Sequence, residues 1–349
     1  MRTRMRLFTP KTRHVAFLFN ALLLVVLIED LCDFSGIRKR EILGTQPFEY
    51  PVLAYALYSL GTSLWGSPLG VSAFIGIVSI VFAVAVTALL THEDADVATW
   101  QGAPSLLMVA VNIDSIVAFL ILSAVTAWQR ARTVPAGVWI GVGIALKVIP
   151  AFIILPLCAA AGWRRVIKLC ATVVLTWAAC NAPQILTDPD AWWFPYAFAS
   201  QRLDTWGTFW KYAPLSPKGV NLASLGLVLV SQIIVSVAVW SRKVRPVAGV
   251  AVALLTFMLV NKVWMPQYIL WVLPLIALLK IARLPVLALE LTTLIYWAAF
   301  WFAVPESWFL VVMLLRSAAA VWVAVAIIRR EQRIGTTVLV NGPPVKIAN

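Results

Sequence analysis

Two polar joints between long apolar runs carry most of the residues that could do chemistry in this 349-residue chain. One joint holds Lys262, Gln267 and Tyr268, and the other is centred on Lys147. Ionisable groups at membrane depth are energetically expensive, so their presence indicates a functional site. The lysines could neutralise an anionic substrate group, although an interfacial aromatic belt with a snorkelling lysine is the alternative interpretation.

Carboxylates beside cations form a second candidate group after the first apolar run. Asp30 and Asp33 precede the basic triplet Arg38, Lys39 and Arg40. The triplet could hold a lipid phosphate, and a neighbouring carboxylate could accept a proton from a hydroxyl nucleophile. A solvated charged loop explains the same residues equally well.

Asn112 and Asp114 lie inside an apolar run, where an ionised carboxylate must be paired, protonated or exposed to water. Lys147 and Lys262 are the obvious partners, and a purely structural ion pair is the alternative. Glu49 and Tyr50 open another run, where a helix-terminus acid and an interfacial tyrosine favour a structural role.

A long loop supplies Arg202, Asp204 and Trp206 among several other tryptophans. Aromatic faces with charged groups between them suit sugar binding, and they equally suit an amphipathic helix on the bilayer. Neither metal-ligand spacing nor a nucleotide-binding motif is present, so we expect no metal or other cofactor.

The elements that position these residues must be membrane helices. The chain is 62% hydrophobic and only 12% charged, which predicts an all-α polytopic membrane protein. Its net charge of +13 is explained by basic loops on the cytoplasmic side, without nucleic acid. The predicted spans are 15–29, 51–66, 69–91, 104–127, 166–183, 220–241, 247–262, 266–282, 284–303 and 307–328.

The basic clusters predict that both termini are cytoplasmic. External loops are expected at 30–50, 92–103, 184–219 and near Glu306, with a cytoplasmic tail at 329–349, all within a single integral membrane domain spanning 1–349. The segment 138–161 lies between two basic clusters, which predicts a re-entrant helix pair meeting at Lys147 and Pro150. A kinked single span is the alternative.

Several motifs resemble those of a known family. The stretch Asn261-Lys-Val-Trp-Met-Pro-Gln-Tyr-Ile-Leu-Trp-Val-Leu-Pro274 resembles the Ser/Asn-Lys-Val-x-x-Pro-Gln-Tyr-x-x-Trp-x-x-Pro signature of glycosyltransferase family 87. That family is related to the catalytic subunit of GPI mannosyltransferase I. Segments 49–53, 112–114, 143–150 and 200–207 resemble further family motifs, and they follow one another along the chain as in the family. Ile113 and Ile149 depart from the family pattern.

The resemblance implies a GT-C-type helical bundle that transfers a hexose, usually mannose, from polyprenyl phosphate with inversion. The acceptor would be a glycolipid or glycan of the membrane or cell envelope, on the non-cytoplasmic face of the plasma membrane. Asp33 is expected to be the general base, with Asp30 as the second choice. A transporter or lipid-linked sugar flippase is the competing function.

The remaining candidates divide by expected ligand. Donor phosphate or substrate binding is expected of Arg38, Lys147, Arg202, Lys262, Gln267 and Tyr268. Acceptor or sugar binding is expected of Glu49, Tyr50, Asn112, Asp114, Asp204 and Trp206.

Overall fold

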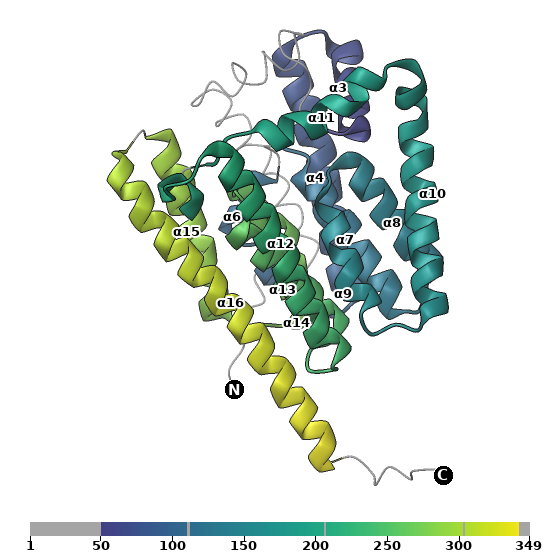
Figure 1. Ribbon diagram of the computed structural model, residues 1–349, viewed down its shortest axis with the longest axis vertical. Helices are drawn as coiled ribbons and strands as arrows, with labels where there is room; N and C mark the ends of the chain where they lie inside the picture. Colours follow the sequence, from purple (N-terminus) through teal and green to yellow (C-terminus); the bar gives the residue numbers. More distant parts are fainter. Residues whose placement is uncertain (1–49, 110–111, 206, 303, 342–349) are drawn as a thin grey trace, which may run out of the picture.

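The protein is helical throughout the part of the chain that the structure describes. This computed structural model describes residues 50–109, 112–205, 207–302 and 304–341 (Figure 1). The first half contains α3 (Val52–Trp65), α4 (Pro68–His92), α5 (Val97–Trp100), α6 (Ala103–Met108), α7 (Asp114–Gln129), α8 (Thr133–Leu146), η1 (Ile149–Ile153) and α9 (Ile154–Cys158). The second half contains α10 (Trp163–Thr187), α11 (Pro189–Gln201), η2 (Phe209–Tyr212), α12 (Pro217–Trp240), α13 (Pro246–Val260), η3 (Pro266–Tyr268), α14 (Ile269–Leu279), α15 (Arg283–Trp301) and α16 (Glu306–Asn341).

Four of these helices, α4, α10, α12 and α16, are long and apolar enough to cross a membrane. The other apolar helices are shorter, because proline or a polar joint interrupts them. This arrangement confirms the predicted all-α membrane fold.

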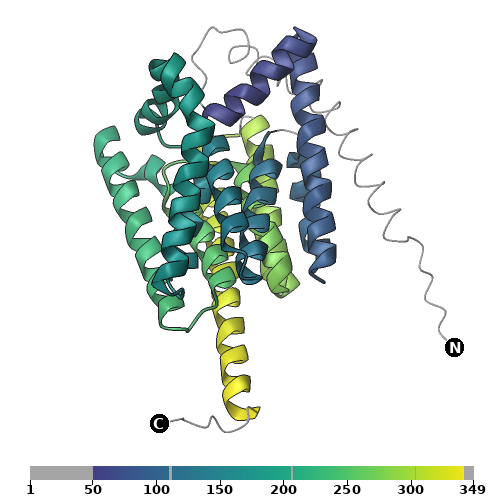
Figure 2. The same cartoon turned by 90° about the vertical axis from the view of Figure 1, so that its right-hand side faces the viewer.

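The short helices form three pairs that leave one end of the bundle and return to it. The pairs are α5–α6 with α7, α8 with η1–α9, and α13 with η3–α14. We call the end to which they return the basic end, because it carries Arg130, Arg165, Arg245 and Lys280. The opposite end, where residues 188–216 connect α10 to α12, is called the loop end. Figure 2 shows α3 and α11 at the loop end, and α16 projecting beyond the bundle at the basic end.

The predicted re-entrant pair at 138–161 is confirmed. Arg165, at the start of α10, donates hydrogen bonds to the carbonyl of Trp128 and to the hydroxyl of Thr133, the latter at 3.2 Å. Its guanidinium also lies 3.6 Å from the centroid of the Trp128 ring. The basic clusters before and after the pair therefore lie at the same end of the bundle. A single crossing would have placed them at opposite ends.

The predicted external loop at 92–103 is wrong. Glu93 pairs with Arg130 at 2.6 Å, and Asp94 pairs with Lys280 at 2.8 Å, so this turn lies at the basic end. The hydrogen bond and charge of Lys280 lower the pKa of Asp94. The prediction counted 51–66 and 104–127 as full crossings between basic clusters. The acids that this count placed outside gave it no independent support, because acidic residues contribute little to membrane orientation.

This correction changes two predicted spans, and the predicted tail also differs from the structure. The 25 residues of α4 rise about 37 Å, so the turn at Gly66 between α3 and α4 lies at the loop end. Predicted span 51–66 is therefore the short helix α3 at that end, and predicted span 104–127 is interrupted at 109–113 between α6 and α7. The predicted tail 329–349 begins inside α16, which continues to Asn341.

Labelling from one side of the membrane tests the corrected topology. In a cysteine-free background, single cysteines at Asp94 and Lys243 should share the same accessibility to an impermeant thiol reagent. A cysteine at Asp188 should show the opposite accessibility, because it lies at the loop end. Common labelling of the Asp94 and Asp188 variants would instead restore the external loop at 92–103.

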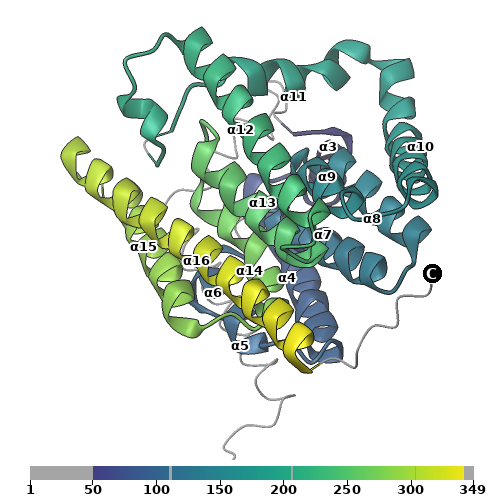
Figure 3. The same ribbon diagram turned by 60° about the horizontal axis from the view of Figure 1, so that its bottom comes forward.

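Glycines allow α8 to pack closely against α10. A Cβ atom at Gly141 would lie 2.9 Å from the carbonyl oxygen of Val173, and one at Gly137 would lie 3.1 Å from that of Leu169. Small residues four positions apart are typical of close contacts between membrane helices. The two glycines therefore hold the re-entrant pair against a long helix, with α10 at the opposite side of the bundle from α15 and α16 (Figure 3).

Enlarging this contact should destabilise the protein. Gly141→Ile is expected to cost about 1–3 kcal/mol through overpacking and to lower the apparent Tm in detergent. Gly226→Ile is the matched control, because a Cβ atom there meets open space. Equal Tm values for the two variants would contradict the close packing.

Candidate functional site

The ammonium of Lys147 forms the centre of the candidate site. Helix α8 ends at Leu146, and Lys147 follows with extended backbone, as expected shortly before Pro150. Its Nζ lies 2.7 Å from Oδ1 of Asp114, whose side chain is fully buried. Asp114 is the first residue of α7, where the positive end of the helix dipole favours a carboxylate.

Three aromatic rings surround the same ammonium. Nζ of Lys147 lies 5.5, 5.3 and 5.1 Å from the ring centroids of Tyr50, Tyr268 and Trp271, respectively. The last two rings are stacked, with centroids 3.9 Å apart. Nε1 of Trp271 also donates a 2.7 Å hydrogen bond to Oδ1 of Asp114. We call Lys147, Asp114 and the three aromatic residues the Lys147 cage; cation–π attraction holds the charge at its centre.

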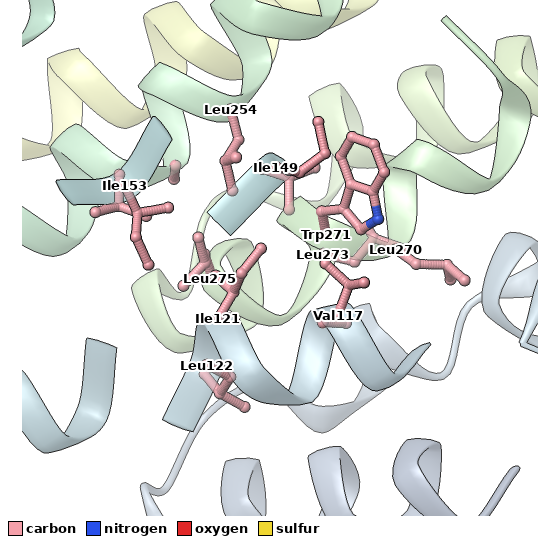
Figure 4. Close-up of a cluster of buried hydrophobic side chains, with 14 of the residues drawn as sticks. Val117, Ile121, Leu122, Ile149, Ile153, Leu254, Leu270, Trp271, Leu273 and Leu275 are labelled. Carbon is pink, nitrogen blue, oxygen red and sulfur yellow. The ribbon is translucent and has the colours of Figure 1, made fainter. Parts of the chain in front are cut away.

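The apolar core fixes one wall of the cage. Trp271 is fully buried, and Figure 4 shows its ring among apolar side chains that include Ile149 of η1 and Val117 of α7. Three helix pairs therefore contribute to one close-packed contact. Such packing restricts side-chain movement, so the indole is held against Asp114.

Asn112 connects the cage to the interrupted helix pair of α6 and α7. Its Nδ2 donates to the hydroxyl of Tyr50 at 3.3 Å, and its Oδ1 accepts from the backbone N–H of Ile113 at 2.7 Å. The hydroxyl of Ser79 in α4 donates to the Asn112 carbonyl at 2.9 Å. Asn112 therefore orients Tyr50.

Oδ2 of Asp114 is buried without a hydrogen-bond partner among the described residues. Buried polar atoms are normally hydrogen-bonded, so this acceptor is suited to a ligand hydroxyl or an ordered water. A fixed cation thus lies beside an acceptor for which the described part of the chain supplies no donor. This pair can bind an anionic group and a neighbouring hydroxyl together.

Lys262 has a different environment. It lies at the start of the joint between α13 and η3, whereas Tyr268 of the cage follows that joint. Its ammonium donates to the carbonyls of Ser200 and Arg202, at 3.3 and 2.6 Å, and to Oδ1 of Asn221. An ammonium has three donors, and these contacts use them all. The Lys262 carbonyl in turn accepts from the N–H of Thr205 at 3.0 Å. Lys262 therefore anchors the loop after α11 to the joint.

The structure brings five predicted residues together in or beside the cage: Tyr50, Asn112, Asp114, Lys147 and Tyr268. Arg202 lies with Lys262 instead, and Asp204 and Gln267 are half-buried in the loop and in η3. Asp30, Asp33, Arg38, Glu49 and Trp206 lie outside the described residues. The described part of the chain contains no group of three or more His, Cys, Asp or Glu residues that could hold a metal.

Trp271 of the cage was not among the predicted site residues, and neither was Arg316, which contacts the joint between α13 and η3. Trp271 belonged to the family signature, but its contact with Asp114 depends on the rotation of α14. Arg316 is fully buried and donates to the carbonyls of Trp264 and Met265, at 3.0 and 3.1 Å. It is the one ionisable residue in predicted span 307–328, and that was a sufficient signal for function.

Comparison with known proteins places three of the five cage residues within the match to a sequence family, and Tyr268 and Trp271 follow that match. The model of "Glycosyltransferase family 87" matches residues 48–265, a range that includes Tyr50, Asn112, Asp114, Lys147 and Lys262. No curated protein is detectably similar in sequence. Among solved structures, the chain is similar to ArnT from Cupriavidus metallidurans bound to undecaprenyl phosphate. The identity is 12%, the match covers 94% of this chain and 79% of ArnT, and the TM-score is 0.49.

Proposed function

The chain belongs to glycosyltransferase family 87, and from that premise we propose that it transfers mannose from polyprenyl phosphate to a glycolipid or glycan acceptor of the cell envelope. The transfer inverts the anomeric centre and takes place on the non-cytoplasmic face. The donor supplies both the sugar and an anionic leaving group, so the reaction needs a fixed cation more than it needs a nucleotide-binding fold.

The Lys147 cage is the observation that carries this proposal. Its ammonium lies 2.7 Å from a buried carboxylate and is surrounded by three aromatic rings, and the Lys147 side chain is itself buried. A preorganised cation of this kind stabilises the charge that develops on a leaving phosphate. The ring faces suit the C–H surface of a sugar, and Oδ2 of Asp114 can accept a bond from a sugar hydroxyl.

The proposed step is a single displacement at the anomeric carbon. An acceptor hydroxyl forms the new C–O bond while the bond from the anomeric carbon to the phosphate oxygen breaks. The electron pair of that bond leaves with polyprenyl phosphate, whose charge Lys147 compensates. Asp33 takes the acceptor proton; this role rests on the sequence resemblance alone.

Transfer from a defined donor tests the proposal. Membranes containing the protein are incubated with radiolabelled polyprenyl-phosphate mannose, and the labelled lipid and glycan products are identified. We expect label to move into a lipid or glycan acceptor only when the protein is present. Transfer from a different polyprenyl-phosphate hexose would overturn the choice of mannose but retain the reaction.

The same membranes distinguish a flippase. A flippase would change the side on which the intact lipid-linked sugar is found, without cleaving the bond between sugar and phosphate. Movement of uncleaved donor with no labelled product would therefore contradict the transferase proposal.

A further inference from the structure

Arg316 lies within the apolar part of the long helix α16 and is fully buried. It lies ten residues after Glu306, the first residue of α16, which is about 15 Å along the helix. No carboxylate among the described residues forms a salt bridge with it. A charge at this depth is expensive, so its environment must compensate it by other means.

Two carbonyl groups and two rings provide that compensation. Nη1 of Arg316 donates to the Trp264 carbonyl at 3.0 Å, and Nη2 donates to the Met265 carbonyl at 3.1 Å. The guanidinium also lies 4.0 Å from the Trp264 ring centroid and 4.9 Å from that of Tyr296. The planar fork of arginine suits two adjacent acceptors and an aromatic face together, which a lysine does not match.

The two carbonyls belong to the non-helical joint between α13 and η3. Carbonyls at a helix interruption lack helical partners, so the joint depends on contacts from elsewhere for a fixed shape. The backbone N–H of Trp264 donates to the hydroxyl of Thr205 at 3.2 Å, on the loop that Lys262 anchors. The joint is therefore contacted from two sides: Thr205 of the loop binds the backbone of Trp264, and Arg316 of α16 binds the carbonyls of Trp264 and Met265.

A second contact joins the loop to the Arg316 environment. A Cβ atom on Gly207 would lie 2.8 Å from Cζ of Tyr296, the ring over which the guanidinium lies. Only glycine allows this approach without displacement of the ring. Helices α15 and α16, the loop and the joint thus meet around one buried cation.

Three residues beyond Met265 is Tyr268, which stacks on Trp271 and faces the ammonium of Lys147. We propose that Arg316 is a positioning residue: it fixes the joint at 264–265 so that Tyr268 and Trp271 keep their places in the Lys147 cage. The inference rests on the proposed function, because it assigns Arg316 an effect on the geometry of transfer.

Two substitutions at Arg316 and one control on the same helix test this assignment. Arg316→Gln removes the charge and the fork, and should lower kcat for polyprenyl-phosphate mannose by about 10²-fold with a smaller change in KM, since an error of about 1 Å in position costs that much. Arg316→Lys keeps a cation that can donate to the carbonyls, and should give an intermediate kcat. Glu331→Gln weakens the contact of Glu331 with Arg245, at 2.8 Å, which ties α16 to α13 at the basic end. It should leave kcat unchanged.

Hydrogen exchange provides a readout that does not depend on activity. In Arg316→Gln the peptide containing 261–268 should exchange faster, while peptides of α13 and α14 exchange as in the unmodified protein; Glu331→Gln should show no such change. Unchanged exchange at 261–268, or equal losses of kcat in Arg316→Gln and Glu331→Gln, would overturn the assignment. If the unmodified protein transfers no sugar, the proposed function fails, and exchange still decides whether Arg316 fixes the joint.

Discussion

Lys147→Gln is expected to lower the turnover of polyprenyl-phosphate mannose by about 10²–10³-fold, the usual effect of removing one group that stabilises developing negative charge. The amide keeps a hydrogen-bond donor near Asp114 but carries no charge to offset the leaving phosphate. The measurement is kcat at saturating donor in reconstituted vesicles, with the amount of folded protein determined by size-exclusion chromatography.

The single substitution also leaves Asp114 as a buried, unpaired carboxylate. Removing one partner of a buried ion pair costs about 3–5 kcal/mol, so lost activity could reflect lost folding. The double variant Asp114→Asn with Lys147→Gln separates these effects. It replaces a 2.7 Å ion pair with a neutral amide pair that Trp271 can still hydrogen-bond.

We expect the double variant to recover stability relative to Lys147→Gln and to remain as slow as it. If turnover recovered together with stability, the charge of Lys147 would be needed only to neutralise Asp114 and not to stabilise the leaving phosphate. The structural ion pair, which was the alternative interpretation of Asp114 in the sequence, would then be correct.

The re-entrant pair could be predicted because the sequence marks both of its ends. Arg130 and Arg132 precede it, and Arg164 and Arg165 follow it, so the positive-inside rule requires an even number of crossings between them. The contact of Arg165 with Trp128 shows that this reasoning was correct. Lys147, at the break between the two helices, was found by the same argument.

Counting every apolar run as a full crossing misled the prediction elsewhere. Glu93 and Asp94 were assigned to the outer side by the count of spans between basic clusters, yet each pairs with a cation at the basic end. Glu290 had no evident partner in the sequence, and in the structure it accepts from Arg283, two turns earlier on α15, at 3.0 Å. The pairs of Glu93 and Asp94 join elements that are distant in the sequence, and the spacing of charges does not encode such contacts. Arg283 and Glu290 lie seven residues apart on one helix, so their pairing could have been expected from the sequence.

The two lysines of the joints also could not be distinguished from the sequence. Both stand shortly before a proline at a joint between two apolar runs, and both were assigned to the donor phosphate. In the structure Lys147 has one carboxylate and three rings around it, whereas Lys262 uses its three donors on the loop and on Asn221. Phosphate binding by Lys262 stays a prediction, and it would require the ammonium to release one of these acceptors.

Asp33→Asn is expected to have the largest effect on the chemical step. The substitution keeps the shape of the side chain and removes the proton acceptor, and loss of general-base catalysis typically costs about 10²–10⁴-fold. The loss should appear in kcat, with donor KM changed little, because a base acts on the acceptor hydroxyl in the transition state. Asp30→Asn and Glu49→Gln are the matched controls, since they remove neighbouring carboxylates of the same predicted loop.

The pattern across the three variants identifies the base. Full activity in Asp33→Asn with a large loss in Asp30→Asn would assign the base to Asp30, and the same pattern in Glu49→Gln would assign it to Glu49. Either result would leave the reaction class intact, because each still identifies one essential carboxylate as the base. Full activity in all three would remove every predicted base from the first loop, and a transferase acting by this displacement would then be the wrong proposal for the chain.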